Sequence, residues 1–453
     1  MAIGDVELVL ADTTPQWVLN AIDPFSTVAV LPTRIDSARA SWTSIMAAAL
    51  FSGYLTARPE RTTFSGPSIA GTGLPRMGPR SEYYGRGDIT SARALPWMPG
   101  YARLVCDGFV AGQPFDACPR QVLRRQIARL AERGWSLQTG IEPEFFLLQR
   151  GERGFEPADA QDRLAKPSYD LKSLPRQATF LHELASALTA CGLQIFQIDH
   201  EDAQGQYELN FLHDDALASA DHLMLFKLAA HALAERHGMV FSMMPKPFAN
   251  QPGSGMHFHV SLWEGERCLF DDHDGENTLR HFIGGVLAHS AGLAALAAPT
   301  VNSYKRLVVG ESLSGTSWAP AYVAHGPNNR TALVRTLAGR FEWRLPDAAA
   351  NPYLATAGLI AAGLDGIARK IDPGPACDDD LFEQPLPALR ARGIGVLPQS
   401  LADAVDALEA DAVLCEALGA TLAHEFIAAR RSEWLSFARH VSEWEMQRYG
   451  DRF

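Results

Sequence analysis

The sequence has no surplus of basic residues, and this argues against nucleic acid as a partner. The formal net charge is −12, from 40 lysines and arginines against 52 aspartates and glutamates. Proteins that bind nucleic acid usually display clustered positive charge, and no basic stripe stands out here. We therefore expect no nucleic-acid partner. The acidic balance fits an enzyme that holds cations, although most acidic proteins bind no functional metal.

Cysteine motifs and long apolar runs are also missing. The six cysteines are scattered, and no Cys-x-x-Cys pair occurs, which argues against a zinc knuckle and against a disulfide framework. No apolar run is long enough to span a bilayer. The first residues, MAIGDVELVLADTT, lack the apolar core of a signal peptide. We expect a cytoplasmic enzyme with reduced cysteines and no membrane partner.

The chain divides into two regions of different composition. Residues 1–107 are rich in Pro, Gly, Ser and Thr, with short apolar runs that predict a small, mostly β domain. Residues 108–453 alternate predicted helices and strands. Apolar spacing and terminal signals indicate helices over 119–134, 175–191, 216–237, 277–297, 351–370 and 400–445.

Four segments carry polar residues at every second position, a pattern typical of strands with one polar face. They are GIEPEFFLL (140–148), QYELNF (206–211), GMHFHVSLW (255–263) and GRFEWRLPD (339–347). One such segment would usually mark an ordinary sheet with one wet face. Four of them, each with a bulky apolar opposite face, predict a shared polar hollow backed by helices.

This hollow would gather enough carboxylates to require a counter-charge. Its predicted polar residues include Glu142, Glu144, Glu208, Glu342, His257 and His259. Crowded carboxylates repel one another and lose hydration when they are buried. Mostly oxygen ligands with an imidazole suit Mg²⁺ or Mn²⁺ better than zinc. The pattern therefore predicts a site for divalent cations.

A set of arginines lies close to these segments in the sequence. NSYKRLVVG (302–310), NRTALVR (329–335) and the last strand supply Arg306, Arg330, Arg335, Arg340 and Arg344. Arginine forks bind phosphate and carboxylate groups through paired hydrogen bonds, and surface ion pairs are the alternative interpretation. Metals with arginines suggest phosphoryl transfer. The pattern GxxxxGK[ST] is absent, so this is not a P-loop enzyme.

The same segments, in the same order, resemble glutamine synthetase. HEDAQGQYELNF (200–211) is similar to a metal motif of that family, KPFANQPGSGMHFHVS (246–261) to its ATP motif, and RFEWRLPDAAANPYLATAGLIAAGLDGI (340–367) to a further long motif. The resemblance implies an α+β fold, with an N-terminal β-grasp domain over residues 1–107. It implies a catalytic domain over residues 108–453, built on a curved antiparallel sheet, a partial barrel, backed by helices. It also implies a homo-oligomer of stacked rings, a dodecamer, with active sites shared between neighbouring subunits.

The resemblance further implies a role for each site residue. One Mg²⁺ or Mn²⁺ ion would be held by Glu144, Glu201 and Glu208, and the other by Glu142, His257 and Glu342. ATP would be bound by His259, Ser261, Arg335, Arg340 and Arg344. The glutamate carboxylate and the transferred phosphoryl group would fall to Arg306 and Arg330. In the implied reaction the γ-carboxylate of glutamate attacks ATP, and an amine displaces phosphate from the γ-glutamyl phosphate formed.

Two departures from the family pattern concern the amine. Glutamine synthetases carry FDGSS, whose Asp helps to bind and deprotonate ammonium, whereas FSGPS (64–68) places Ser65 there, unless this short stretch is misaligned. The flap after NSYKRL reads VGESLSGTSWAPAYVAHGPNN in place of a shorter PGYEAP stretch. Glu311 lies one position before the place where the family has the Glu of its PGYEAP flap. Trp318 and Tyr322 add aromatic surface, which favours an alkylammonium ion through cation–π contact.

Both departures favour an amine other than ammonia. The flap and ALPWMPGYARLVCDGFV (94–110) resemble the branch of the family that uses methylamine, the γ-glutamylmethylamide synthetases. Ammonia, ethanolamine and polyamines remain alternative substrates, because one methyl group contributes only about 1–3 kcal/mol of selectivity. A catalytically inactive member of the family, a pseudo-enzyme, is less consistent with the sequence, because all of the predicted metal ligands are present. Phe382 stands where adenylylated relatives have tyrosine, so no adenylylation is expected there.

Overall fold

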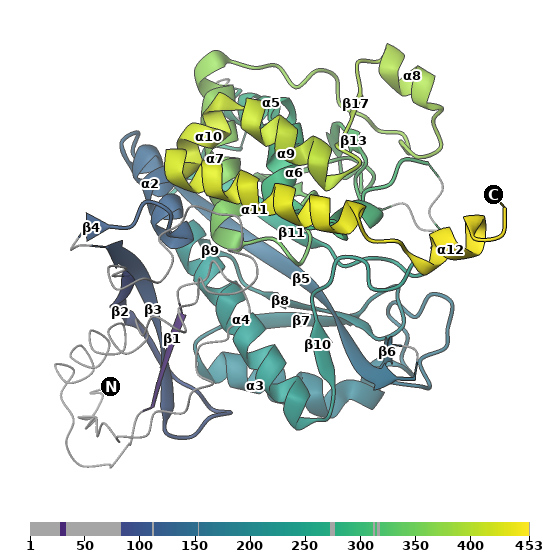
Figure 1. The fold of residues 1–453 in the computed structure, drawn as a ribbon. Coiled ribbons are helices and arrows are strands. Elements are labelled where there is room, and N and C mark those ends of the chain that lie inside the picture. The colour runs from purple at the N-terminus through teal and green to yellow at the C-terminus, as the bar shows by residue number, and fades with distance from the viewer. Residues whose placement is uncertain are drawn as a thin grey trace, which may run out of the picture.

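A small sheet lies at one end of the molecule (Figure 1). The computed structural model describes residues 28–32, 83–110, 113–152, 154–271, 277–310, 313–314 and 318–452. The small sheet has the order β1–β3–β2, with β4 beside β3. Its strands are β1 (Val28–Pro32), β2 (Tyr83–Ala94), β3 (Tyr101–Val110) and β4 (Gln113–Pro114). Most of residues 1–107 falls outside the described residues, so the β-grasp assignment and the boundary at 107 stay predictions.

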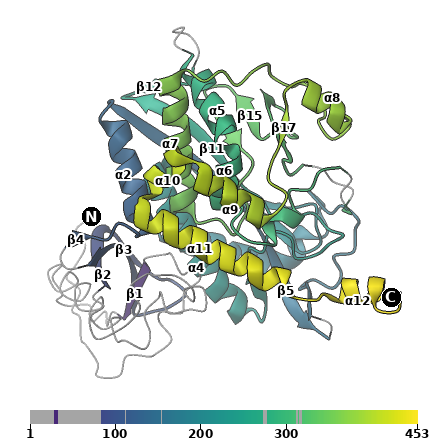
Figure 2. The ribbon, with the colours of Figure 1, turned by 45° about the horizontal axis from the view of Figure 1, so that its top comes forward.

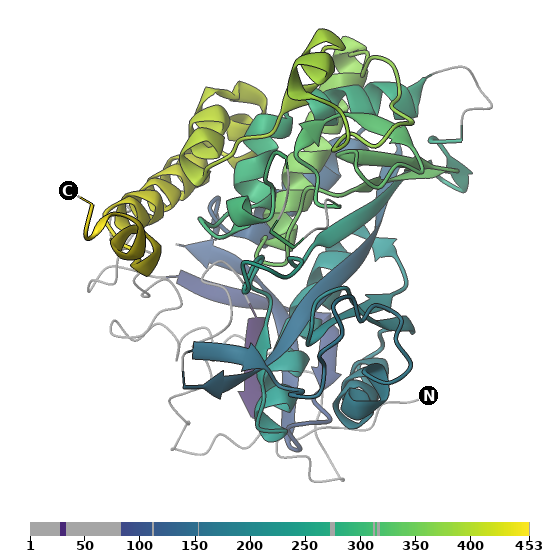
Figure 3. The ribbon, with the colours of Figure 1, turned by 90° about the vertical axis from the view of Figure 1, so that its right-hand side faces the viewer.

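The second sheet has 11 strands, and its main path runs β14–β15–β16–β11–β5–β8–β7. The four strands predicted from alternating polarity are consecutive neighbours in this path, namely β16 (Arg340–Trp343), β11 (Met256–Glu264), β5 (Trp135–Gly151) and β8 (Gln206–Phe211). The others on the path are β7 (Ile195–His200), β14 (His325–Pro327) and β15 (Val334–Leu337). Figure 3 shows the long β5 running diagonally across the molecule.

Short strands complete the sheets. β6 (Gly154–Pro157), β9 (Asp214–Asp215) and β10 (Val240–Ser242) pair with β5, and β12 (Arg267–Cys268) pairs with β11. β13 (Tyr322–Val323) and β17 (Gly395–Val396) form a separate pair. The prediction of an antiparallel sheet is corrected in one respect, because β14 pairs with β15 in parallel. Alternating polarity reveals the face of a side chain and not the direction of its strand.

Helices follow the predicted ranges, but two predicted helices are divided. The undivided ones are α2 (Pro119–Ala131), α3 (Ala178–Ala190), α4 (Ala216–Arg236) and α7 (Pro352–Arg369), and a short α8 (Leu386–Ala391) was not predicted. The range 277–297 splits into α5 (Thr278–Ala288) and α6 (Ser290–Ala297). The range 400–445 splits into α9 (Leu401–Ala410), α10 (Ala412–Leu418), α11 (Ala420–Ala438) and α12 (Glu443–Tyr449).

The divisions have local causes. Asp411 leaves the helical region, with ψ at 96°, and its side chain accepts a hydrogen bond from the backbone N–H of Leu414 at the start of α10. Gly419 has φ of 84°, a conformation that other residues rarely adopt. Between α5 and α6, the imidazole of His289 bonds to Asp365 and Asp411 at 3.0 and 2.6 Å. Apolar periodicity continues across such breaks, so it predicted longer helices.

Helices cover the apolar face of the large sheet. Phe145 of β5 packs on Phe226 of α4 with ring centroids 5.7 Å apart, and Phe341 of β16 packs on Phe282 of α5 at the same separation. All four side chains are fully buried, as is Trp343. This confirms that the bulky faces of the predicted strands pack on a helical layer. The polar faces are therefore left for the hollow on the other side.

A buried ion cluster joins the small sheet to the catalytic helices. The Arg120 guanidinium, at the start of α2, lies 2.7 Å from Asp107 of β3 and 2.9 Å from Asp221 of α4. Asp221 also accepts a hydrogen bond from the hydroxyl of Tyr353, and its backbone carbonyl accepts one from Arg103. Strand β3 and the three helices α2, α4 and α7 are thus fixed to one another through charge-assisted hydrogen bonds.

The C-terminal helix α12 stands apart from the rest of the molecule. Figure 1 and Figure 2 show it beyond the end of α11, which runs across the body. A capping box from Ser442 and Glu445 starts α12, and none of its residues is buried. No single helix in the described ranges is long and apolar enough to cross a membrane; one pair, Ala412–Leu418 with Ala420–Tyr449, meets that test together but bends by 108°.

Candidate active site

Strand register places the predicted polar residues side by side. On β11, His257 lies opposite Glu142 of β5, and His259 lies opposite Glu342 of β16. On the other side of β5, Glu144 lies opposite Glu208 of β8. Directly opposed residues share a face and have close Cβ atoms. Six of the predicted residues therefore share one face of the sheet across four neighbouring strands, where the sequence predicted the polar hollow.

One half of the hollow combines two carboxylates and two imidazoles. His259 Nε2 lies 2.9 Å from Glu142 Oε1, while His257 Nδ1 lies 3.3 Å from Glu342 Oε1 and 3.8 Å from Glu142 Oε2. Ligand atoms of Glu142, His259 and Glu342 all lie within 4.8 Å of one another. Both histidines are thus within reach of a cation here. The assignment of His257 as ligand and His259 as phosphate contact stays a prediction.

Positive neighbours dominate the electrostatics of this half. Burial acts to raise the pKa of Glu142, but hydrogen bonds from His257 and His259 outweigh it, so the pKa is well below its ordinary value. The pKa of Glu342 is lowered in the same way, with Arg344 as the main opposing charge to burial. Both carboxylates therefore remain ionised across the neutral pH range.

Three predicted arginines converge on the same groups. Arg335 donates to Glu342 Oε2 at 2.8 Å, and Arg344 donates to Glu342 Oε1. Arg340 donates through Nε to Nδ1 of His259 at 3.3 Å. Ser261, which was also predicted to bind ATP, accepts a hydrogen bond from the indole of Trp263 at 2.8 Å. These arginines are positioned around the carboxylates, and their roles toward phosphate stay predictions.

The other half of the hollow consists of glutamates whose pKa values are shifted mainly by burial and by other carboxylates. Burial and the charges of Glu144, Asp199 and Asp202 raise the pKa of Glu201 to about 8. Burial, followed by the charges of Glu142, Glu144 and Glu201, raises the pKa of Glu208 well above its ordinary value. The charges that contribute most to the pKa of these two carboxyls are those of other carboxylates. An oxygen-only set with this unmet charge fits a hard divalent cation.

Arg306 lies between the two halves and is almost fully buried. Its guanidinium donates to the backbone carbonyls of Leu345 and Arg344 at 3.1 and 3.2 Å, and lies 3.4 Å from Nε2 of His257. Burial lowers the pKa of Arg306, and the nearby carboxylate of Asp347 opposes this effect. The side chain is therefore held rigidly beside the glutamates.

The predictions for the flap have mixed outcomes. Trp318 is 52% exposed, with the Arg330 guanidinium 5.4 Å from its ring centroid, and its carbonyl accepts a hydrogen bond from Arg344 at 3.1 Å. The prediction that Tyr322 adds aromatic surface is wrong, because Tyr322 is buried against Phe382 with ring centroids 5.2 Å apart. The flap sequence has no periodic pattern that would show which of the two aromatic residues faces inward.

Two predicted catalytic residues cannot be placed, and one neighbour of the site was not predicted. Ser65 and Glu311 lie outside the described residues, so their roles stay predictions. Tyr169 has φ of 59° and is 71% exposed. Its backbone N–H donates to the carbonyl of His200 at 3.2 Å, which places Tyr169 next to the residue that precedes Glu201. Partial burial and the charges of Glu201 and Asp199 raise the pKa of its phenol. A left-handed tyrosine outside any strand or helix leaves no periodic signal in the sequence.

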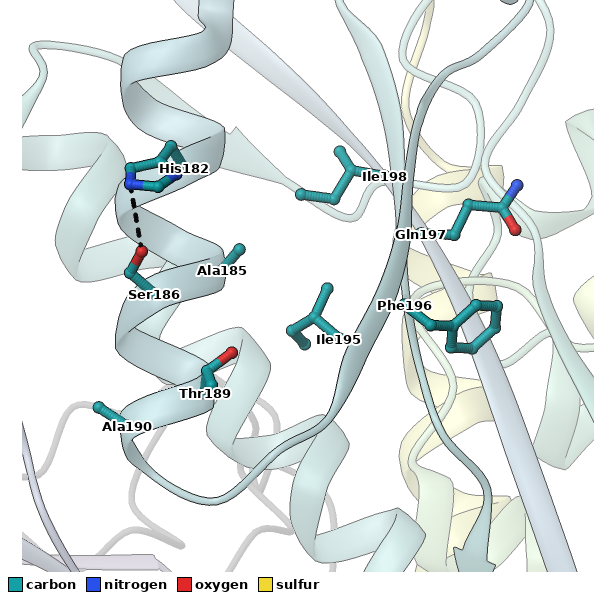
Figure 4. A pocket seen from close by; sticks show the side chains of 9 residues that line it. All are labelled: His182, Ala185, Ser186, Thr189, Ala190, Ile195, Phe196, Gln197 and Ile198. Carbon is teal, nitrogen blue, oxygen red and sulfur yellow. Dashed lines mark hydrogen bonds between the residues drawn. The ribbon is translucent and has the colours of Figure 1, made fainter.

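A pocket of about 780 Å³ lies elsewhere, between α3 and β7 (Figure 4). Ile195 and Ile198 of β7 face Ala185 across it, and His182 and Ser186 of α3 bond to each other at its rim. Its lining residues include no carboxylate, lysine or arginine. Its one imidazole, His182, bonds to Ser186 and has no carboxylate or cation beside it in the lining, so the polar hollow remains the candidate site.

Comparisons with known proteins agree with this geometry. Residues 116–449 match the family description "Glutamine synthetase, catalytic domain". The chain is 46% identical over 407 residues to a glutamate–methylamine ligase from Methyloversatilis universalis, covering 88% of this chain and 91% of that protein. It is 39% identical over 367 residues to a glutamine synthetase from Rhizobium meliloti, covering 80% and 83%.

Solved structures give the same result. A structure described as "GmaS/ADP complex-Conformation 1" aligns with a TM-score of 0.78 and 40% identity, over 83% of this chain and 87% of that chain. A second, described as "Apo GmaS without ligand", aligns with a TM-score of 0.75 and 39% identity, over the same shares. From the profile match, the relatives and the shared fold, we conclude that the chain belongs to the glutamine synthetase family.

Proposed function

We propose that this chain is an ATP-dependent ligase that joins methylamine to the γ-carboxyl group of glutamate through γ-glutamyl phosphate, with release of ADP and phosphate. The observation that carries the reaction class is the single hollow formed by β16, β11, β5 and β8, in which carboxylates, imidazoles and arginines face one another. The choice of methylamine rests on the likeness to the glutamate–methylamine ligase.

The donor set supports two Mg²⁺ or Mn²⁺ ions. Glu144, Glu201 and Glu208 would hold one ion, which their unmet negative charge favours. The second would lie at Glu142 and Glu342 with an imidazole ligand. Bound metal ions would neutralise charge that develops on the transferred phosphoryl group.

The arginines supply fixed positive charge for the anionic substrates. Arg306 is held by two backbone carbonyls and would fix a glutamate carboxylate. Arg335, Arg340 and Arg344 surround Glu342 and His259, where the phosphates of ATP would lie. Arg330 lies at the rim on Trp318 and would contact the transferred group. Preorganised donors of this kind stabilise developing charge without reorganisation during the reaction.

A homo-oligomer fits the exposed apolar residues of the C-terminal segment. Val441, Trp444, Met446 and Tyr449 are all between 45% and 64% exposed. Apolar side chains gathered on a projecting helix suit contact with another protein surface. We propose that a second copy of this chain covers them, in an assembly of stacked rings.

The decisive experiment compares amines. Phosphate release would be measured with ATP, Mg²⁺ and glutamate, using methylamine, ammonium, ethylamine, ethanolamine and putrescine in turn. We expect the highest kcat/KM with methylamine. A higher value with ammonium would identify a glutamine synthetase instead, and no stimulation by any amine would refute the ligase assignment. A Glu208→Gln variant, which removes one proposed metal ligand, controls for contaminating ATPases and should release almost no phosphate.

A further inference from the structure

The side chain of Gln206 is buried at the point where three segments of the site meet. Gln206, at the start of β8, is 1% exposed. Its Nε2 donates to Oε2 of Glu144 at 2.9 Å and to the carbonyl of Gly253 at 3.2 Å. Its Oε1 accepts a hydrogen bond from the backbone N–H of Ala203 at 3.1 Å. The carboxamide thus links β5, the glycine-rich loop and the loop before β8.

These bonds distinguish the two oxygens of Glu144. Oε2 accepts one hydrogen bond from Gln206 and a second from the backbone N–H of Gly255, each at 2.9 Å. No bond to Oε1 is seen among the described residues. Oε1 faces other groups of the site instead, since a Cβ atom added to Gly255 would lie 2.9 Å from it, 2.6 Å from His257 Nε2 and 3.0 Å from Arg306 Nη2. One oxygen is therefore committed to the protein and the other is available.

The same residue fixes the loop that carries Glu201. The backbone N–H of Glu201 donates to the carbonyl of Gln206 at 2.9 Å, which closes residues 201–206 into a short loop. The bond from Ala203 to the Gln206 carboxamide ties the middle of this loop to the side chain. Displacement of the carboxamide would therefore move Glu144 and Glu201 together.

We propose that Gln206 is a positioning residue that presents Glu144 to a divalent cation through Oε1 alone and sets the place of Glu201 beside it. This inference rests on the proposed two-metal function. The chemistry requires an amide at this position, because Glu144 Oε2 needs a donor and the Ala203 N–H needs an acceptor. A carboxylate would provide only acceptors and would add charge beside Glu144. Residues that orient a metal ligand typically contribute about 10- to 100-fold in metal affinity or activity.

The test measures Mn²⁺ binding to the metal-free protein by calorimetry, without substrates. We expect Gln206→Glu and Gln206→Met to bind Mn²⁺ about 10- to 100-fold more weakly than the native protein. Part of the lost kcat should return at high Mn²⁺. Gln204→Glu is the matched control, since it adds the same charge to the same loop from a side chain that bonds to Leu164 and Gln251 instead of Glu144. It should bind Mn²⁺ like the native protein.

The outcomes separate this inference from the proposed function. If the native protein binds no Mn²⁺, the two-metal function fails. If the native protein binds Mn²⁺ and both Gln206 variants bind it equally well, only the positioning role is refuted. A crystal structure of the native protein with Mn²⁺ provides a test that needs no variant. Glu144 should contact the ion through Oε1, with Oε2 still bonded to Gln206, and bidentate contact would overturn the inference.

Discussion

A methyl group added at Gly255 should inactivate the site while leaving the fold intact. A Cβ atom there would lie 2.6 Å from His257 Nε2, 2.9 Å from Glu144 Oε1 and 3.0 Å from Arg306 Nη2. These distances fall 0.8, 0.5 and 0.4 Å short of the 3.4 Å at which ordinary contact begins. The three atoms that must move are the ends of side chains, so the backbone need not shift. They are also the atoms that would bind metal and substrate.

The expected loss follows from the size of these shifts. A misplacement on the order of 1 Å lowers an enzymatic rate by roughly 100-fold. We expect Gly255→Ala to lower kcat by roughly 10- to 100-fold and to weaken Mn²⁺ binding, with little change in Tm. Gly395→Ala is the control, because its Cβ would make ordinary contact with Val323 at 3.7 Å. Native kcat and Mn²⁺ affinity in Gly255→Ala would refute this account of the hollow.

Three further changes test other parts of the structure. Arg120→Met removes the buried centre of the ion cluster and should lower the free energy of unfolding by about 3–5 kcal/mol in urea titrations. The hydrogen bond to Asp411 raises the pKa of His289 above 6.5, so its stabilising charge is complete below that pH and lost as pH rises through the raised pKa. The stability difference between the native protein and His289→Gln should therefore shrink as pH rises above about 6.5. Trp318→Leu keeps the carbonyl bond to Arg344 but removes the ring beneath Arg330, and should lower kcat/KM about 2- to 5-fold, as expected for an exposed cation–π contact of about 0.5–1 kcal/mol.

The composition of the hollow could be predicted because alternation has a fixed period. Residues such as Glu142 and His257 lie in segments where every second residue is polar and the residues between are bulky and apolar. Any sheet that buries the apolar residues turns the polar ones to a common side. The antiparallel arrangement of the sheet was implied by the family resemblance. The parallel pairing of β14 and β15 was not, since neither pattern nor resemblance specified the direction of such short edge strands.

Residues that support the site could not be predicted in this way. Gln206 and Glu208 are two positions apart, so the alternating pattern treats them alike. Nothing in the pattern shows that Glu208 faces the hollow while the side chain of Gln206 bonds to Glu144 from within the protein. Tyr169 lies in an irregular segment, where no periodicity exists. Their positions depend on contacts between segments far apart in the sequence. These contacts follow from the tertiary structure and not from local spacing.

The pKa values of glutamates in the two halves of the hollow are shifted in opposite directions, and this difference is testable. The pKa of Glu142 is lowered by its histidines, whereas that of Glu201 is raised to about 8 by burial and by neighbouring carboxylates. A carboxyl whose pKa is raised on folding destabilises the metal-free protein increasingly as pH rises above its unfolded value of 4.5, until about 8. Glu201→Gln removes that cost, so the metal-free variant should have a higher Tm than the metal-free native protein, by a margin that grows from about pH 5 to about pH 8. Mn²⁺ should raise the Tm of the native protein and have less effect on the variant, because the cation supplies the missing counter-charge. A variant with a lower Tm at pH 8 would show that Glu201 already has a compensating partner in the fold.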